Sequence, residues 1–107
     1  MNPSDDLQLL ASNELGHILF LAETNQMMIG LGTVILKFPP QGCKVFLKTV
    51  SGLQCKLKCS SGCRSKAFIQ TPINNMMIAL NQKEVSQAVE LLEMALLRLE
   101  VEELLKY

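Results

Sequence analysis

Tryptophan is absent from this chain, and its 107 residues include only four phenylalanines, one tyrosine and one histidine. Aliphatic and methionine side chains must therefore fill the core, and few aromatic rings remain on which nucleic-acid bases could stack. No uninterrupted apolar run approaches the roughly 20 residues that a membrane-spanning helix needs. These absences argue against a membrane protein and against a typical binder of single-stranded nucleic acid.

The usual motifs of catalysis are also missing. The sequence contains no Ser–His–Asp order, no glycine-rich phosphate loop and no motif of paired carboxylates. Any general-base mechanism would rest on His17, the only histidine, and its place at the start of a predicted strand is typical of a structural imidazole. The sequence therefore favours a non-enzymatic role, although it names no ligand, reaction or pathway.

Acidic and basic residues are confined to different parts of the chain, although the net charge is zero. No acidic residue lies between Glu23 and Glu84, and that stretch holds most of the lysines, whereas residues 84–107 are rich in glutamate. The two regions can complement each other within one chain or across a dimer. The first six residues carry two aspartates in place of the positive charge of a secretory signal. We therefore expect a cytoplasmic protein with reduced cysteines.

An apolar content of 49% indicates a folded domain. We interpret residues 1–13 as an N-terminal tail and residues 14–107 as a single α+β domain. Side-chain periodicity and turn residues predict strands over 17–22 and 27–38, a short helix over 40–52, a loop over 54–65, a hairpin over 66–71 and 75–80, and a helix over 81–107. Two such strand–strand–helix units would form a mainly antiparallel four-stranded sheet, covered by the short helix and the long C-terminal helix.

The C-terminal helix has the clearest pattern. Asn81 stands three residues before Glu84, which is the spacing of a capping box, and apolar residues then recur at alternating steps of four and three. Because this apolar surface is too wide for one small sheet to cover, we expect a homodimer in which glutamates beside the contact meet lysines of the second chain. The residues predicted at this interface are Leu91, Met94, Leu97, Val101 and Leu105.

The first predicted hairpin carries a family resemblance. His17-Ile18-Leu19 is followed by Ile29-Gly30-Leu31-Gly32-Thr33-Val34-Ile35-Leu36-Lys37-Phe38. This pattern resembles a group of small, functionally uncharacterised bacterial proteins found mainly in Bacteroidetes, over residues 16–50 and the closing segment 75–105. In that group cysteines follow soon after the histidine, whereas Phe20 to Thr24 contains none. The resemblance implies a fold and a bacterial origin, and it implies no activity.

Three cysteines at steps of four, Cys55, Cys59 and Cys63, form a candidate metal site that Cys43 or His17 could complete. Thiolates bind zinc tetrahedrally, and nearby lysines would lower the thiol pKa and favour the metal-binding form. Typical zinc knuckles, however, separate two cysteines by two residues and repeat the pair. A zinc-binding module is therefore the first alternative to an interaction module, beside redox-active or simply reduced cysteines.

The basic segment over residues 44–66 is a candidate nucleic-acid interface, because lysine and arginine neutralise phosphates. Phe46 is its only aromatic residue, and its spacing places it in the core. A solvated basic face is the preferred interpretation, and nucleic-acid binding is the second alternative function. The residues that would make the phosphate contacts are Lys44, Lys48, Lys56, Lys58 and Arg64.

Overall fold

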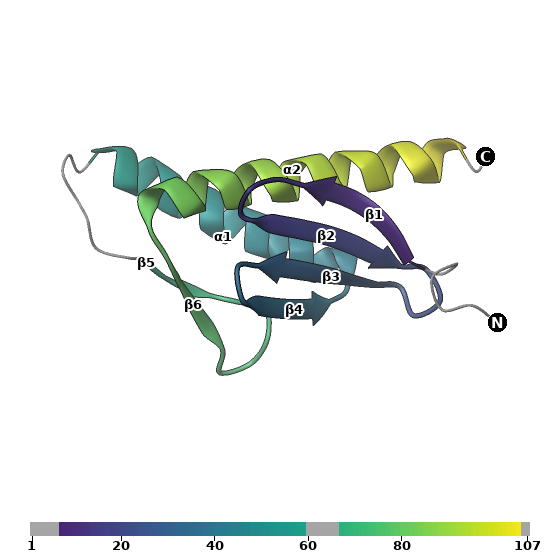
Figure 1. The fold of residues 1–107 in the computed structure, drawn as a ribbon, viewed down its shortest axis with the longest axis horizontal. Helices are drawn as coiled ribbons and strands as arrows, with labels where there is room; N and C mark the ends of the chain where they lie inside the picture. The colour runs from purple at the N-terminus through teal and green to yellow at the C-terminus, as the bar shows by residue number, and fades with distance from the viewer. Residues whose placement is uncertain (1–6, 60–66, 106–107) are drawn as a thin grey trace.

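The computed structural model describes residues 7–59 and 67–105, and it confirms an α+β fold with a four-stranded antiparallel sheet and a long C-terminal helix (Figure 1). None of the described helices is long and apolar enough to cross a membrane. The elements follow in the order β1 (Leu7–Ser12), β2 (Gly16–Leu21), β3 (Gln26–Leu31), β4 (Val34–Phe38), α1 (Pro40–Cys59), β5 (Ala67–Gln70), β6 (Met77–Leu80) and α2 (Gln82–Leu105).

The four-stranded sheet is a simple meander in which each strand pairs with the next in the chain. Its last turn contains only Gly32 and Thr33, and Leu31 pairs with Val34 across it. Gly32 has a φ of 62°, which glycine adopts without the steric cost that a side chain would bring. A turn of two residues allows the two strands only one alignment, and so it fixes the register of β3 against β4.

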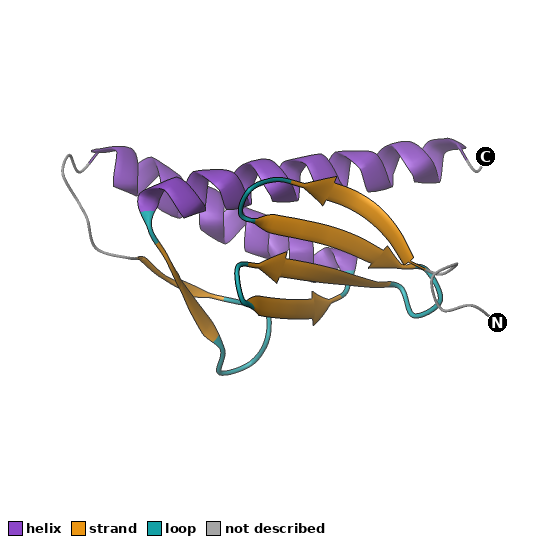
Figure 2. Cartoon of the chain, viewed as in Figure 1, coloured by secondary structure: helices purple, strands orange, loops and turns teal. Residues whose placement is uncertain are grey.

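Both helices lie on one side of the sheet, where they pack against each other and against the strands (Figure 2). The core lies between these two layers. Ile18, Ile29 and Leu36 from the sheet are fully buried there, as is Phe46 from α1. The Phe46 ring meets the edge of Phe38, with ring centroids 6.0 Å apart, and this contact joins β4 to α1.

Helix α2 begins with the predicted capping box. The backbone N–H of Glu84 donates to Asn81 Oδ1 at 2.8 Å, and the N–H of Asn81 donates to Glu84 Oε1 at 2.9 Å. Further along, Asn13 Nδ2 in the β1–β2 turn donates to the carbonyl oxygen of Gln87 at 2.9 Å. The bond to Asn81 Oδ1 satisfies a backbone N–H that the first turn of a helix leaves free. The bond from Asn13 ties α2 to the β1–β2 turn beside the sheet.

Four parts of the fold differ from the sequence-based expectations. The strand expected over 27–38 is two strands, β3 and β4, which pair with each other across the Gly32–Thr33 turn. Residues 7–12 of the expected tail form strand β1, because Leu7 and Leu9 pair with Leu21 and Leu19 of β2. All four strands of the main sheet therefore come from the first half of the chain, and β5 and β6 form a separate two-stranded sheet. Helix α1 continues to Cys59, through much of the expected loop, because Leu53 packs on the core beyond Gly52.

Candidate functional site

Helix α2 carries apolar side chains on two opposite faces, and only one of them is covered by the described part of the chain. The covered face lies against the core and includes Val85, Ala88, Leu92, Ala95 and Leu99. We call the uncovered face the outer stripe. It consists of Met94, Leu97, Val101, Leu104 and Leu105.

The outer stripe contains four of the five predicted interface residues. Leu91 is the exception, because it is fully buried within its own chain and cannot form part of a surface. Leu97, in contrast, is 62% exposed, and the sequence-based prediction missed Leu104, which is 75% exposed. The steps from Met94 to Leu97, Val101 and Leu104 are three, four and three residues, which is the spacing of a helix seam that packs against a partner.

Charged residues flank the outer stripe unequally. By helical spacing, Glu93 and Glu100 lie on one flank, and both are exposed. Arg98 lies on the other flank, where its Nε is 3.6 Å from Oε1 of Glu102, one turn further along the same helix. One flank is therefore acidic, whereas the charge of the other is partly neutralised within the helix.

The sheet has a second uncovered apolar surface, on the face turned away from the helices, over which no described segment lies (Figure 2). We call it the open sheet face. Cross-strand pairing places its residues side by side, since side chains alternate between the two faces of each strand. Its apolar residues are Leu7, Leu9, Leu19, Leu21, Met28 and Ile35, and its polar ones are Ser12, His17, Gln26 and Lys37.

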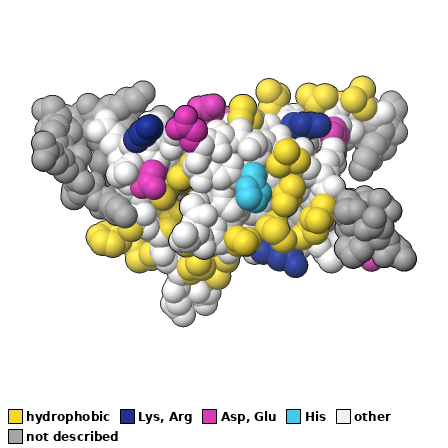
Figure 3. Space-filling model, viewed as in Figure 1, with side chains coloured by type: hydrophobic (Ala, Val, Ile, Leu, Met, Phe, Trp, Pro, Cys, Tyr) yellow, Lys and Arg dark blue, Asp and Glu magenta, His cyan; other side chains and the backbone are white. Residues whose placement is uncertain are grey.

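This composition is unusual for an open antiparallel sheet, whose solvated face normally carries polar side chains. In Figure 3 hydrophobic side chains lie beside the single histidine, to its right and below it. A Cβ on Gly30 would lie 3.3 Å from His17 Nε2, so the imidazole ring lies over Gly30, beside the 66% exposed Ile35. The sequence-based prediction missed this face. The unbroken apolar runs 18–21 and 27–29 were the available signal, because such runs are typical of strands covered on both faces.

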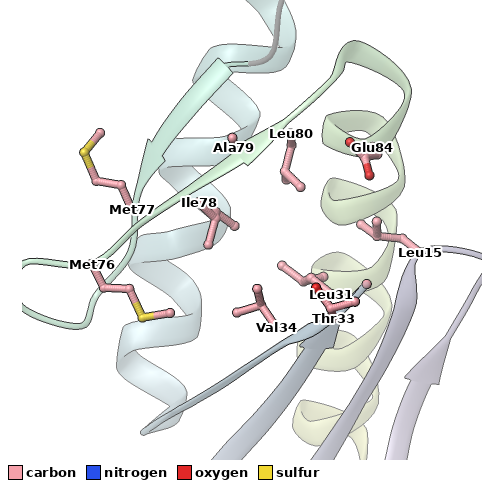
Figure 4. Close-up of a pocket in the computed structure, with 11 residues that line it drawn as sticks. Leu15, Leu31, Thr33, Val34, Met76, Met77, Ile78, Ala79, Leu80 and Glu84 are labelled. Carbon is pink, nitrogen blue, oxygen red and sulfur yellow. The ribbon is translucent and has the colours of Figure 1, made fainter.

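A cleft of 430 Å³ opens where the β5–β6 hairpin passes the end of the main sheet (Figure 4). Its walls are Leu15, the β3–β4 turn from Leu31 to Val34, the consecutive residues Met76–Leu80, and Glu84. The volume is in the range of small-molecule sites. Glu84 is the only titratable residue among these, and its Oε1 accepts the capping bond from Asn81. The cleft therefore lacks a pair of groups for acid–base chemistry.

Of the four predicted metal ligands, Cys43 is the one whose side chain the structure describes. Cys43 is fully buried in the core beneath the sheet, and desolvation raises the pKa of its thiol to about 12. It stays protonated at neutral pH, and a zinc ion could reach it only by entering the core, so its burial argues against the predicted role as the fourth ligand. Cys55 and Cys59 lie in the last turns of α1, and Cys63 lies outside the described residues. Among the described residues, no three potential metal ligands lie close enough together to hold one ion.

The predicted nucleic-acid residues are placed only in part. Lys44 and Lys48 are exposed one turn apart on α1. Lys56 and Lys58 lie in the final turns of the same helix, whereas Arg64 lies outside the described residues. Phe46 points into the core, as the sequence indicates, and so no exposed aromatic ring accompanies the two placed lysines on their helix. This arrangement fits a solvated basic face.

The two uncovered apolar surfaces are therefore the most distinctive features of the described chain. Neither brings together a nucleophile and a base, or a set of metal ligands. Comparison with known proteins does not extend this picture, because no family model matches the chain and no similar curated protein or solved structure was found.

Proposed function

We propose that this chain is a cytoplasmic interaction module that acts as a homodimer, in which a second copy covers the outer stripe of α2. The observation that carries the proposal is the pair of opposed apolar faces on one helix. A helix that is apolar on two sides is typical of a helix covered on two sides. The sheet and α1 cover the core face of α2, and a partner is needed to cover the outer stripe.

The regular spacing of the residues in the outer stripe supports an interaction surface. The alternative is that these are unrelated apolar side chains that happen to be exposed. Single exposed leucines are common on protein surfaces and need no explanation. Here Leu97, Val101 and Leu104 continue one line along the helix for about two turns, and each is exposed. Contiguous apolar patches of this kind mark interaction sites.

Burial of the outer stripe in a dimer sets a lower limit on how much affinity one substitution in it removes. Burying a leucine stabilises a contact by about 1.5–3 kcal/mol relative to leaving it in water. A symmetric dimer contains each interface residue twice, so replacing Leu97 by glutamate removes at least about 3 kcal/mol. Such a loss raises the dissociation constant of the dimer by more than about 100-fold.

The test is the mass of the protein in solution, measured by light scattering and by sedimentation at micromolar concentration. The wild-type chain is expected to be a dimer and Leu97→Glu a monomer. Val45→Glu is a matched control, because Val45 on α1 is 60% exposed, close to the 62% of Leu97, and lies outside the stripe. It should remain a dimer.

Two results would contradict the proposal. A monomeric wild-type chain at these concentrations would remove the dimer itself. A dimer that survives Leu97→Glu as well as Val45→Glu would place the contact elsewhere. Far-UV circular dichroism of both variants establishes that a change in mass does not come from unfolding.

A further inference from the structure

Strands β5 and β6 form a two-stranded sheet, so each of them has one edge without a neighbouring strand. Natural proteins usually protect a free edge with a charged side chain, a proline or a bulge. Strand β6 is Met77-Ile78-Ala79-Leu80 and has none of these, since its register with β5 is continuous. Its free edge is therefore able to pair with a further strand.

Hydrogen bonding across the hairpin shows which backbone groups point to this edge. The N–H of Thr71 donates to the carbonyl oxygen of Met76 at 3.1 Å. In an antiparallel ladder, residues that bond to the partner strand alternate with residues that do not. The register of β6 with β5 therefore turns the peptide groups of Ile78 toward β5, and it turns those of Met77 and Ala79 toward the free edge.

The 430 Å³ cleft lies along this free edge. It is lined by the five consecutive residues Met76–Leu80, and by no residue of β5 from Phe68 to Gln70. The side chain of Ile78 points into the cleft, whereas that of Met77 points away from it (Figure 4). A residue whose side chain points away can line a cleft only through its backbone. The peptide groups of Met77 therefore border the cleft.

We propose that this cleft binds an extended peptide segment of a partner protein, which pairs with the free edge of β6 as a third strand. The N–H and C=O groups of Met77 and Ala79 bond to the peptide backbone, and every second side chain of the peptide enters the cleft. This inference goes beyond the homodimer, because the outer stripe takes no part in it.

The walls of the cleft select apolar side chains in the peptide. Strand β6 has four residues, or about 13 Å of edge, so two side chains of the bound segment face the cleft. Aliphatic side chains from four parts of the chain surround the space that they enter. These are Leu15, Leu31, Val34, Ile78 and Leu80.

Glu84 adds a preference for positive charge. It is half-buried in the wall of the cleft at the start of α2, and its Oε1 accepts the capping bond, which leaves Oε2 for a ligand. No described lysine or arginine lines the cleft to neutralise this carboxylate. We therefore expect a basic residue at one end of the bound segment.

Amide hydrogen exchange of the full-length chain, followed by NMR, tests the free edge. Without ligand, the amides of Met77 and Ala79 should exchange at least tenfold faster than those of Ile78 and Leu80, which bond to β5. Equal protection of all four amides would overturn the assignment of the edge.

The probe is a peptide of about six alternating valine and threonine residues with one lysine at each end, which exceeds the four residues of β6. At saturation it should slow exchange at Met77 and Ala79 at least tenfold. Two N-methylated forms of the peptide then test strand pairing, because each blocks a different alternate set of its amides. The form blocked on the side of β6 should bind at least tenfold more weakly than the unmodified peptide, and the other within threefold. Equal binding of the two forms would overturn the proposal.

Glu84→Gln tests the charge preference, because glutamine keeps the capping acceptor and removes the negative charge. It should weaken binding of the peptide about threefold. Glu90→Gln is the matched control, since Glu90 is exposed on the same helix and does not line the cleft. It should leave the dissociation constant unchanged, and an equal effect of both variants would overturn the role of Glu84.

The outcomes are distinguishable from those for the homodimer. A monomeric wild-type chain that binds the peptide would end the homodimer alone, and a dimer whose edge the peptide does not protect would end this inference alone. Protection of Met77 and Ala79 that rises with protein concentration, without peptide, would identify a second copy as the third strand and overturn the peptide partner.

Discussion

The pKa of the Cys43 thiol depends on how completely the core beneath the sheet excludes water. The side chain of Cys43 is fully buried, and desolvation of the thiolate raises the pKa of the thiol from 9.0 to about 12. The unfolded chain therefore releases this proton at a lower pH than the folded chain does. Between these two pKa values the unfolded state binds fewer protons, so the free energy of unfolding falls as the pH rises.

The size of the effect follows from the difference between the two pKa values. The contribution of the buried thiol is fully present below about pH 9 and is lost progressively toward pH 12. The slope between them is about 1.4 kcal/mol per pH unit. At pH 10.5 the wild-type chain should therefore have lost about 2 kcal/mol of stability through Cys43 alone.

Urea unfolding at pH 7.5 and pH 10.5, followed by circular dichroism under reducing conditions, measures this loss against Cys43→Ala. The other groups that titrate in this range are common to both proteins, so they cancel in the comparison. The variant has a lower stability at both pH values, because a buried side chain has been shortened. Between pH 7.5 and pH 10.5, the free energy of unfolding of the variant should fall by about 2 kcal/mol less than that of the wild-type chain. Equal losses would mean that water reaches the thiol.

The remaining predictions concern the backbone. Asn81→Ala should lower the free energy of unfolding by about 1 kcal/mol and increase amide exchange in the first turn of α2, because the backbone N–H of Glu84 loses its acceptor, Asn81 Oδ1. Gly16→Ala should cost about 3 kcal/mol in urea unfolding, since a Cβ would stand 1.6 Å from the carbonyl oxygen of Gly30. Gly52→Ala, in α1 with no atom within 4 Å of its new Cβ, should stabilise by about 1 kcal/mol. A destabilising Gly52→Ala or a neutral Gly16→Ala would contradict this account.

Local signals in the sequence predicted the elements whose structure depends on neighbouring residues. The capping box of Asn81 and Glu84 identified the start of α2. The alternation of Leu36 and Phe38 correctly indicated a strand there, although the prediction joined β3 and β4 into one strand. Strand β1 was missed because its formation depends on pairing with β2, and residues 7–10 read alone fit a short helix as well as a strand. The end of α1 was missed because Gly52 is a common stop, whereas Leu53 finds a place on the core that only the folded chain provides.

The apolar surface of α2 was likewise predictable where it depends on the helix alone, and not where it depends on the whole fold. The sequence shows that α2 has more apolar surface than one small sheet can cover, but it cannot show which part remains exposed. That depends on the width of the layer beneath the helix. Helix α2 packs against β1 and β2 as well as α1, and this wider body encloses Leu91 while Leu97 stays in water. Strand β1 also enlarges the open sheet face, to which it adds Leu7 and Leu9. The pairing of β1 with β2 therefore widens both the layer beneath α2 and the apolar face of the sheet that is turned away from the helices.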